Sequence, residues 1–140
     1  MTDLERAIAA LPGHSIALCR GETLMTSDLR GIAPMMAFLT KGENLSGFAV
    51  ADLVVGKAAA MLFHKAGIRA VYAKTLSESG KAYLEAHGIP VEYETLTQVI
   101  RNRQGDGICP MEATVANLND PKEAFAALTA RLAALRAGKS

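Results

Sequence analysis

The feature that most constrains this chain is an apolar run from Phe48 to Phe63, in which only Asp52 and Lys57 carry charge. The run is too short and too charged to cross a membrane, which takes about 20 consecutive apolar residues. It must therefore be buried inside a folded domain. We expect one long helix over residues 46–65, ended by Gly67 and packed centrally on a sheet.

Segments with strand-like and helix-like patterns alternate along the rest of the chain. Strands are predicted at 15–20, 23–27, 68–74 and 89–95, and helices at 3–11, 28–42, 75–88, 96–103 and 121–137, with a further short helix opening at Pro110. Thr2 is the expected N-cap of the first of these helices, and Ser27 or Asp28 that of the second. Strands separated by helices favour parallel pairs with right-handed crossovers, and the early hairpin adds an antiparallel edge. The prediction is a three-layer α/β/α fold with a mixed sheet, in a single domain over residues 1–140 whose last helix is 121–137.

Composition narrows the class of protein. The length of 140 residues is typical of a single domain. Half of the residues are hydrophobic, and the net charge is only +1. Scattered basic residues argue against a nucleic-acid partner. Two cysteines and an N-terminus without a secretory signal favour a reducing, cytoplasmic location without membrane anchoring.

Familiar cofactor motifs are missing from the sequence. It has no phosphate-binding loop, no Gly-x-Gly-x-x-Gly and no Gly-x-Ser-x-Gly, and its three histidines lack metal-ligand spacing. We therefore expect no cofactor and no bound metal.

Asp52 and Lys57 are the first candidate site residues, because burying an unpaired charge is costly. On one helix they would lie about 140° apart and would not pair with each other. Either Asp52 faces a pocket as a catalytic acid or base with Lys57 contacting the ligand, or both are structural, in an ion pair with another element or with Lys57 reaching solvent.

Cys109 and Glu112 form a second candidate pair at the start of the helix that Pro110 opens. A thiol at a helix N-terminus becomes a better nucleophile because the helix dipole favours thiolate. Glu112 is then a supporting acid or base. The alternative is a structural helix start with Glu112 as a capping carboxylate.

Ligand-binding candidates are Ser77 and Ser79, which begin a helix directly after a strand, where open α/β sheets bind ligands. The alternative is that one of these serines only caps its helix. Ser27, after the hairpin, is placed in the same cleft, and Arg103, like Arg101, could contact a phosphate or carboxylate.

Two long segments carry a family resemblance. FAVADLVVGKAAAMLFHKAGIRAVYAKT is similar to the motif helix and following strand of the cytidine deaminases, and YAKTLSESGKAYLEAHGIPVEYE to the strand, Pro-Cys-x-x-Cys helix and next strand. The whole chain, and GICPME in particular, resembles a small bacterial family, Domain of Unknown Function 1893. The resemblance implies a cytidine deaminase-like topology and a small-molecule partner, a nucleoside or nucleotide.

The zinc ligands of that superfamily are missing at the matching positions. Zinc deaminases use one His or Cys and two further Cys as ligands, with a Glu that moves protons. Val50, Ala51 and Asp52 stand at the first motif, and Ser77 to Gly80 at the second. The resemblance therefore implies a zinc-free domain that binds a small ligand in the former active-site cleft.

Two further hypotheses remain open from the sequence. One is an enzyme that uses Cys109 as nucleophile with Asp52 or Glu112 as acid or base. The other is a non-catalytic module that forms a homodimer, because the Ala-rich segments 48–66 and 121–137 allow close helix packing.

Overall fold

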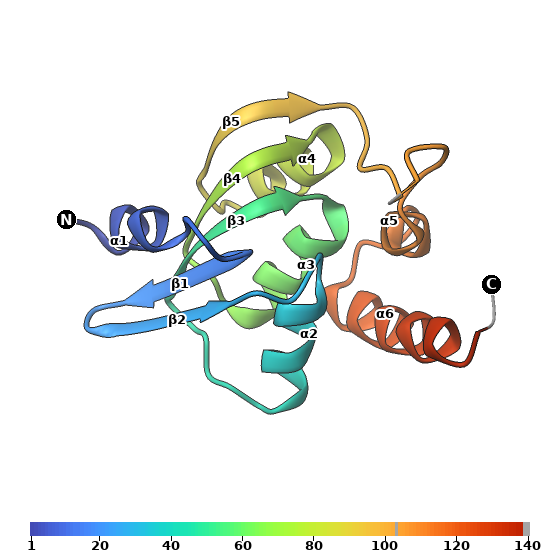
Figure 1. Cartoon of the computed structure of the whole chain (residues 1–140), viewed down its shortest axis with the longest axis horizontal. Coiled ribbons are helices and arrows are strands. Elements are labelled where there is room, and N and C mark those ends of the chain that lie inside the picture. The colour runs from blue at the N-terminus through green and yellow to red at the C-terminus, as the bar shows by residue number, and fades with distance from the viewer. Residues whose placement is uncertain (103, 139–140) are drawn as a thin grey trace.

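The computed structural model describes residues 1–102 and 104–138, and within them five strands form one mixed sheet in the order β2-β1-β3-β4-β5. Figure 1 shows β2 and β5 at the two edges. The strands are β1 (Ile16–Arg20), β2 (Thr23–Ser27), β3 (Ala49–Val55), β4 (Ala70–Ser77) and β5 (Val91–Thr97), and the helices are α1 (Asp3–Ala10), α2 (Ala33–Thr40), α3 (Lys57–Ala66), α4 (Glu78–Ala86), α5 (Pro110–Val115) and α6 (Pro121–Arg136). The predicted α/β class with a mixed sheet is confirmed.

The sheet combines an antiparallel part with a parallel part. The predicted hairpin is confirmed, since β1 and β2 pair antiparallel with Ile16 opposite Ser27. β1 also pairs antiparallel with β3, where Leu18 lies opposite Val50. β3, β4 and β5 are parallel, and α3 and α4 make the two crossovers between them.

The single long helix expected over residues 46–65 is wrong. Its first half is β3 (Ala49–Val55), and only the second half, Lys57–Ala66, is the helix α3. Apart from Asp52, β3 is apolar throughout, and its first four residues are buried on both faces, so its periodicity does not distinguish it from a buried helix. The boundary is Gly56, whose backbone is extended, with φ −106° and ψ −170°.

Helices cover both faces of the sheet, which gives the three predicted layers. On one face α1 packs Ala7 and Leu11 against Cys19 of β1 and Ala51 of β3. The other face carries the main core, to which the remaining five helices all contribute. α6 packs against α3 and α5 on the outer side of this layer (Figure 1).

Two smaller expectations are also wrong. The helix predicted over 96–103 does not form in its described part, 96–102, because Leu96 and Thr97 continue β5 and pair with β4. Sheet pairing here overrides local propensity. The cap predicted at Ser27 and Asp28 is absent, since α2 begins after Ile32 without a side-chain cap.

Three helix ends match their predictions. Thr2 caps α1 and forms a capping box with Glu5. Gly67 ends α3 in the left-handed conformation, with φ +78°. Pro110 occupies the first turn of α5. These signals are local, so the sequence carries them without tertiary context.

Candidate functional site

The starts of α3 and α4 lie against each other at the carboxyl ends of β3 and β4. A Cβ added to Gly80 in the first turn of α4 would lie 3.0 Å from the carbonyl carbon of Gly56, just before α3. Glycine at position 80 therefore lets the two backbones approach. In parallel α/β sheets this edge is the usual place for a ligand.

The carboxylate of Glu112 occupies the N-terminus of α3. Its Oε1 accepts the peptide N–H of Lys57 and its Oε2 accepts that of Ala58, each at 2.8 Å. A carboxylate is favoured there by the free N–H groups and the helix dipole. Glu112 thus acts as a cap, but for a helix distant in sequence rather than for its own.

Lys57 makes a second contact between the start of α3 and α5, next to the one made by Glu112. Its amino group donates a hydrogen bond to the carbonyl oxygen of Ala116, the C-cap of α5, at 3.2 Å. Lys57 and Glu112 therefore both join α5 to the start of α3. The ligand contact predicted for Lys57 stays a prediction.

A small cavity of about 90 Å³ adjoins this junction and brings two predicted residues together. Cys109 and Glu112 both line it, alongside mainly apolar neighbours. The full lining is Gly31, Ile32, Val54, Gly56, Ala59, Ile100, Cys109, Met111 and Glu112. Cys109 is the residue before α5 and is partly buried as a free thiol.

Asp52 lies in the middle of the strand β3, not on a helix as expected. It pairs with Ile16 on one side and Ala73 on the other, so its side chain shares the face of the main core. Burial raises the pKa of Asp52 to about 8, although hydrogen bonds from the backbone of Val54 and Leu53 oppose that rise. Of the ion pairs formed within the described ranges, none includes Asp52.

The two serines at the start of α4 differ in burial. Ser77 is fully buried and caps α4, its Oγ accepting the N–H of Gly80 at 3.0 Å. Ser79 is exposed and lies with its Oγ 3.2 Å from that of Ser77. The capping alternative is confirmed for Ser77, and ligand contact by either serine stays a prediction.

Neither Ser27 nor Arg101 is among the residues that line the small cavity, although Arg101 follows Ile100, which is. Ser27 ends β2, and its Oγ accepts the N–H of Leu29 at 3.2 Å. Arg101 forms an isolated bridge with Ile108. Arg103 lies outside the residues that the structure describes.

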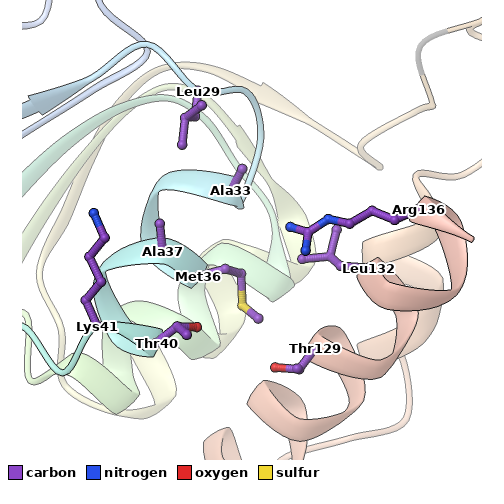
Figure 2. Close-up of a pocket in the computed structure, with 9 residues that line it drawn as sticks. All are labelled: Leu29, Ala33, Met36, Ala37, Thr40, Lys41, Thr129, Leu132 and Arg136. Atoms are coloured by element: carbon purple, nitrogen blue, oxygen red, sulfur yellow. The ribbon is translucent and has the colours of Figure 1, made fainter.

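A larger groove between α2 and α6 has a volume of about 460 Å³ (Figure 2). Its lining consists of Leu29, Ala33, Met36, Ala37, Thr40, Lys41, Thr129, Leu132 and Arg136. Sequence reasoning missed it, because the two walls come from opposite ends of the chain. The only signal was a positive charge near the end of each helix, at Lys41 and Arg136.

No group of three or more His, Cys, Asp or Glu side chains in the described part of the chain lies in an arrangement that would hold a metal ion. Nor do residues 1–102 and 104–138 contain a helix with the length and apolar character needed to span a bilayer.

The mixed five-stranded sheet, with helices on both faces, defines a three-layer α/β domain. Residues 8–132 match the family model described as domain of unknown function DUF1893, and the chain belongs to this family. The crystal structure of a DUF1893 family protein from Thermotoga maritima is similar, with a TM-score of 0.83 and 24% identity, over 94% of this chain and 91% of that one. No curated protein matches the chain.

Proposed function

We propose that this domain binds a small molecule in the groove between α2 and α6. The observation that carries the proposal is the size of the groove, about 460 Å³. Small-molecule sites have volumes of roughly 300–1,000 Å³ and combine an apolar lining with a few polar groups. Here Met36 and Leu132 supply apolar surface, while Thr40 and Thr129 supply hydroxyl groups.

The edge of the sheet at β3 and β4 is a weaker candidate for the binding site. The cavity there measures about 90 Å³, below the range of ordinary ligand sites. The carboxylate of Glu112 already takes the N–H groups of Lys57 and Ala58 that an anionic ligand would use. This internal cap favours the α2–α6 groove over the strand ends.

The resemblance to the cytidine deaminase-like proteins supports including nucleosides among the ligands to be tested. Asp52, matched by that resemblance to a motif helix, lies inside β3, and α3 begins with Lys57. Neither Lys57 nor Ala58 has a side chain that binds zinc. We therefore propose binding without zinc rather than deamination.

Ligand binding is tested by calorimetry with nucleosides, nucleotides and small apolar acids on the purified chain. Ala37→Leu places a larger side chain in the groove, and Ala126→Leu places the same side chain on an exposed position of α6 as the matched control. We expect at least a tenfold loss of affinity in Ala37→Leu and none in the control. Binding that survives Ala37→Leu unchanged would contradict the groove as the site.

A second copy of the chain is the alternative occupant of the groove, which would be one form of the homodimer hypothesis. Light scattering on the wild type and on Ala37→Leu separates the two. A monomer in both variants excludes this occupant, whereas a dimer that Ala37→Leu disrupts would replace the small-molecule proposal.

Thiol chemistry at Cys109 is the second candidate function, since Cys109 and Glu112 line one cavity. Both Glu112 oxygens accept backbone hydrogen bonds, so any acid–base role for Glu112 would compete with capping. Iodoacetamide labelling tests this candidate, with Cys109→Ser reporting the background from the buried Cys19. A rate equal to that of a free cysteine would rule out an activated thiolate.

A further inference from the structure

The α2–α6 groove differs from the rest of the chain in its charge. The whole sequence is nearly balanced, with 15 basic and 14 acidic residues. The nine residues that line the groove include two cations, Lys41 and Arg136, and no acidic side chain. Positive charge is therefore concentrated on a lining that is otherwise apolar or carries only hydroxyl groups.

Both cations are available for a ligand, as far as the described residues extend. The ion pairs among those residues include neither Lys41 nor Arg136. Their side chains also donate no hydrogen bond to another group in the same ranges, so no internal acceptor there neutralises the positive charge.

The side chains lie so that one ligand can meet charge and apolar surface together. Figure 2 shows the guanidinium of Arg136 extending from α6 toward α2 beside Leu132, with Met36 pointing from α2 toward α6. Lys41 extends from the C-terminal end of α2, with its amino group on the side of Ala37 that faces away from Arg136. Apolar surface therefore lies between the two positive groups.

The positions of Lys41 and Arg136 have a second explanation, because the C-terminal end of a helix favours positive charge even without a ligand. Lys41 is the C-cap of α2 and Arg136 lies in the last turn of α6, where the helix dipole stabilises positive charge. The dipole does not account for their joint presence in the lining of one groove with Met36 and Leu132. The two explanations differ in a measurable way, because only a ligand site links these charges to affinity.

We propose, on the basis of the binding function above, that the groove selects a small organic acid with an apolar body. The apolar body lies on Met36 and Leu132, and the anionic oxygens accept hydrogen bonds from the guanidinium of Arg136. A guanidinium matches a carboxylate or phosphate with two parallel hydrogen bonds. Lys41, at the C-terminal end of α2, supplies the other positive charge of the lining.

The test compares four probes that share one eight-carbon chain: octanoate, octyl phosphate, octanol and octylamine. Calorimetry on the wild-type chain is expected to show binding of one or both acids at least tenfold tighter than that of octanol, with octylamine weakest. The stronger of the two acids identifies the carboxylate or the phosphate as the preferred anionic group.

Arg136→Gln and Lys41→Gln remove the charges, and Arg131→Gln is the matched control, since Arg131 lies on α6 outside the groove lining. We expect about a tenfold loss of acid binding in Arg136→Gln, a smaller loss in Lys41→Gln and none in Arg131→Gln. Thermal melting of each variant shows that the fold is retained.

Failure of this inference is distinct from failure of the binding function. Octanol binding that equals octanoate binding, and that Ala37→Leu abolishes, would overturn the acid preference while keeping the groove as a ligand site. Acid binding that Arg136→Gln leaves unchanged would likewise overturn it. If none of the four probes, nucleosides or nucleotides binds in a way that Ala37→Leu weakens, both proposals fail.

Discussion

A methyl group on Gly56 would lie 2.3 Å from Oε1 of Glu112, so the absence of a side chain at position 56 lets α5 cap α3. The contact joins residues 56 positions apart in the chain. It depends on two different properties: a carboxylate that satisfies two N–H groups, and a glycine that leaves room for it. The φ of Gly56 is −106°, so room rather than backbone conformation requires the glycine.

Replacing either partner of this contact should cost stability, and the two costs should not add. Glu112→Ala removes two partly buried hydrogen bonds and is expected to lower the free energy of unfolding by about 1–3 kcal/mol. Gly56→Ala should cost a similar amount, because the carboxylate is displaced. Urea unfolding of both single variants and the double variant measures the coupling.

Gly107→Ala is the control for these variants, since its Cβ would meet only the side-chain nitrogen of Asn102, at 3.4 Å. We expect a change within about 0.5 kcal/mol for the control. Fully additive costs for Gly56→Ala and Glu112→Ala would show that the glycine is needed for another reason.

The raised pKa of Asp52 predicts that the protein becomes less stable as the pH rises. Its pKa is about 8 in the folded chain, against an ordinary value of 3.8 when unfolded. Between these values the folded state holds the extra proton. The free energy of unfolding should therefore fall as pH rises from about 4 to 8, by up to about 1.4 kcal/mol per pH unit from this group.

Asp52→Asn keeps the shape of the side chain and removes its titration. We expect this variant to match the wild type near pH 4 and to exceed its stability by roughly 1–4 kcal/mol at pH 8, where the wild type is penalised for the buried charge. Urea unfolding across this range measures it, with the exposed Glu22→Gln as control. A parallel pH profile for Asp52→Asn and wild type would refute the assigned shift.

Replacing Ser77 and replacing Ser79 should change the free energy of unfolding by different amounts. Ser77→Ala removes the cap of α4 and is expected to lower the free energy of unfolding by about 1 kcal/mol. Ser79→Ala changes an exposed residue and should stay within about 0.5 kcal/mol. Thermal and urea unfolding measure both, and an equal cost at the two positions would contradict the assignment of Ser77 as the cap.

His64 on α3 contacts two residues of the second crossover: Tyr83 within α4, and His87, the C-cap residue of α4. Its Nδ1 is 2.7 Å from the hydroxyl of Tyr83, and the centroids of the His64 and His87 rings are 4.5 Å apart. Burial, and secondly the charge of His87, lower the pKa of His64 below its ordinary value of 6.5. Because the unfolded chain binds this proton more readily, acidification through pH 6.5 should reduce stability.

An NMR titration of the His64 ring checks this shift. Replacing His87 with Gln should raise the pKa of His64, since a nearby positive charge is removed. His14→Gln, on the far hairpin side of the chain, is the control and should leave that pKa unchanged. A His64 pKa at or above 6.5 in the wild type would count against the cluster as described.

The part of the fold that could be predicted rests on short-range patterns. Thr2, Gly67 and Pro110 mark helix ends through interactions within one turn, and the hairpin of β1 and β2 needs only neighbouring residues. The boundary at Gly56 was missed, although Val50, Val54 and Val55 before it and an alanine run after it favour a strand followed by a helix.

The sequence by itself determined the α/β class, the hairpin and most helix ends, because these depend on local propensity and on apolar spacing along the chain. Tertiary structure alone decided that Glu112 caps α3, that Asp52 is buried in β3, and that α2 and α6 form a groove. Each of these depends on residues distant in sequence. No periodicity records which distant backbone N–H a carboxylate will meet, because that contact exists only once the sheet and its helices have packed.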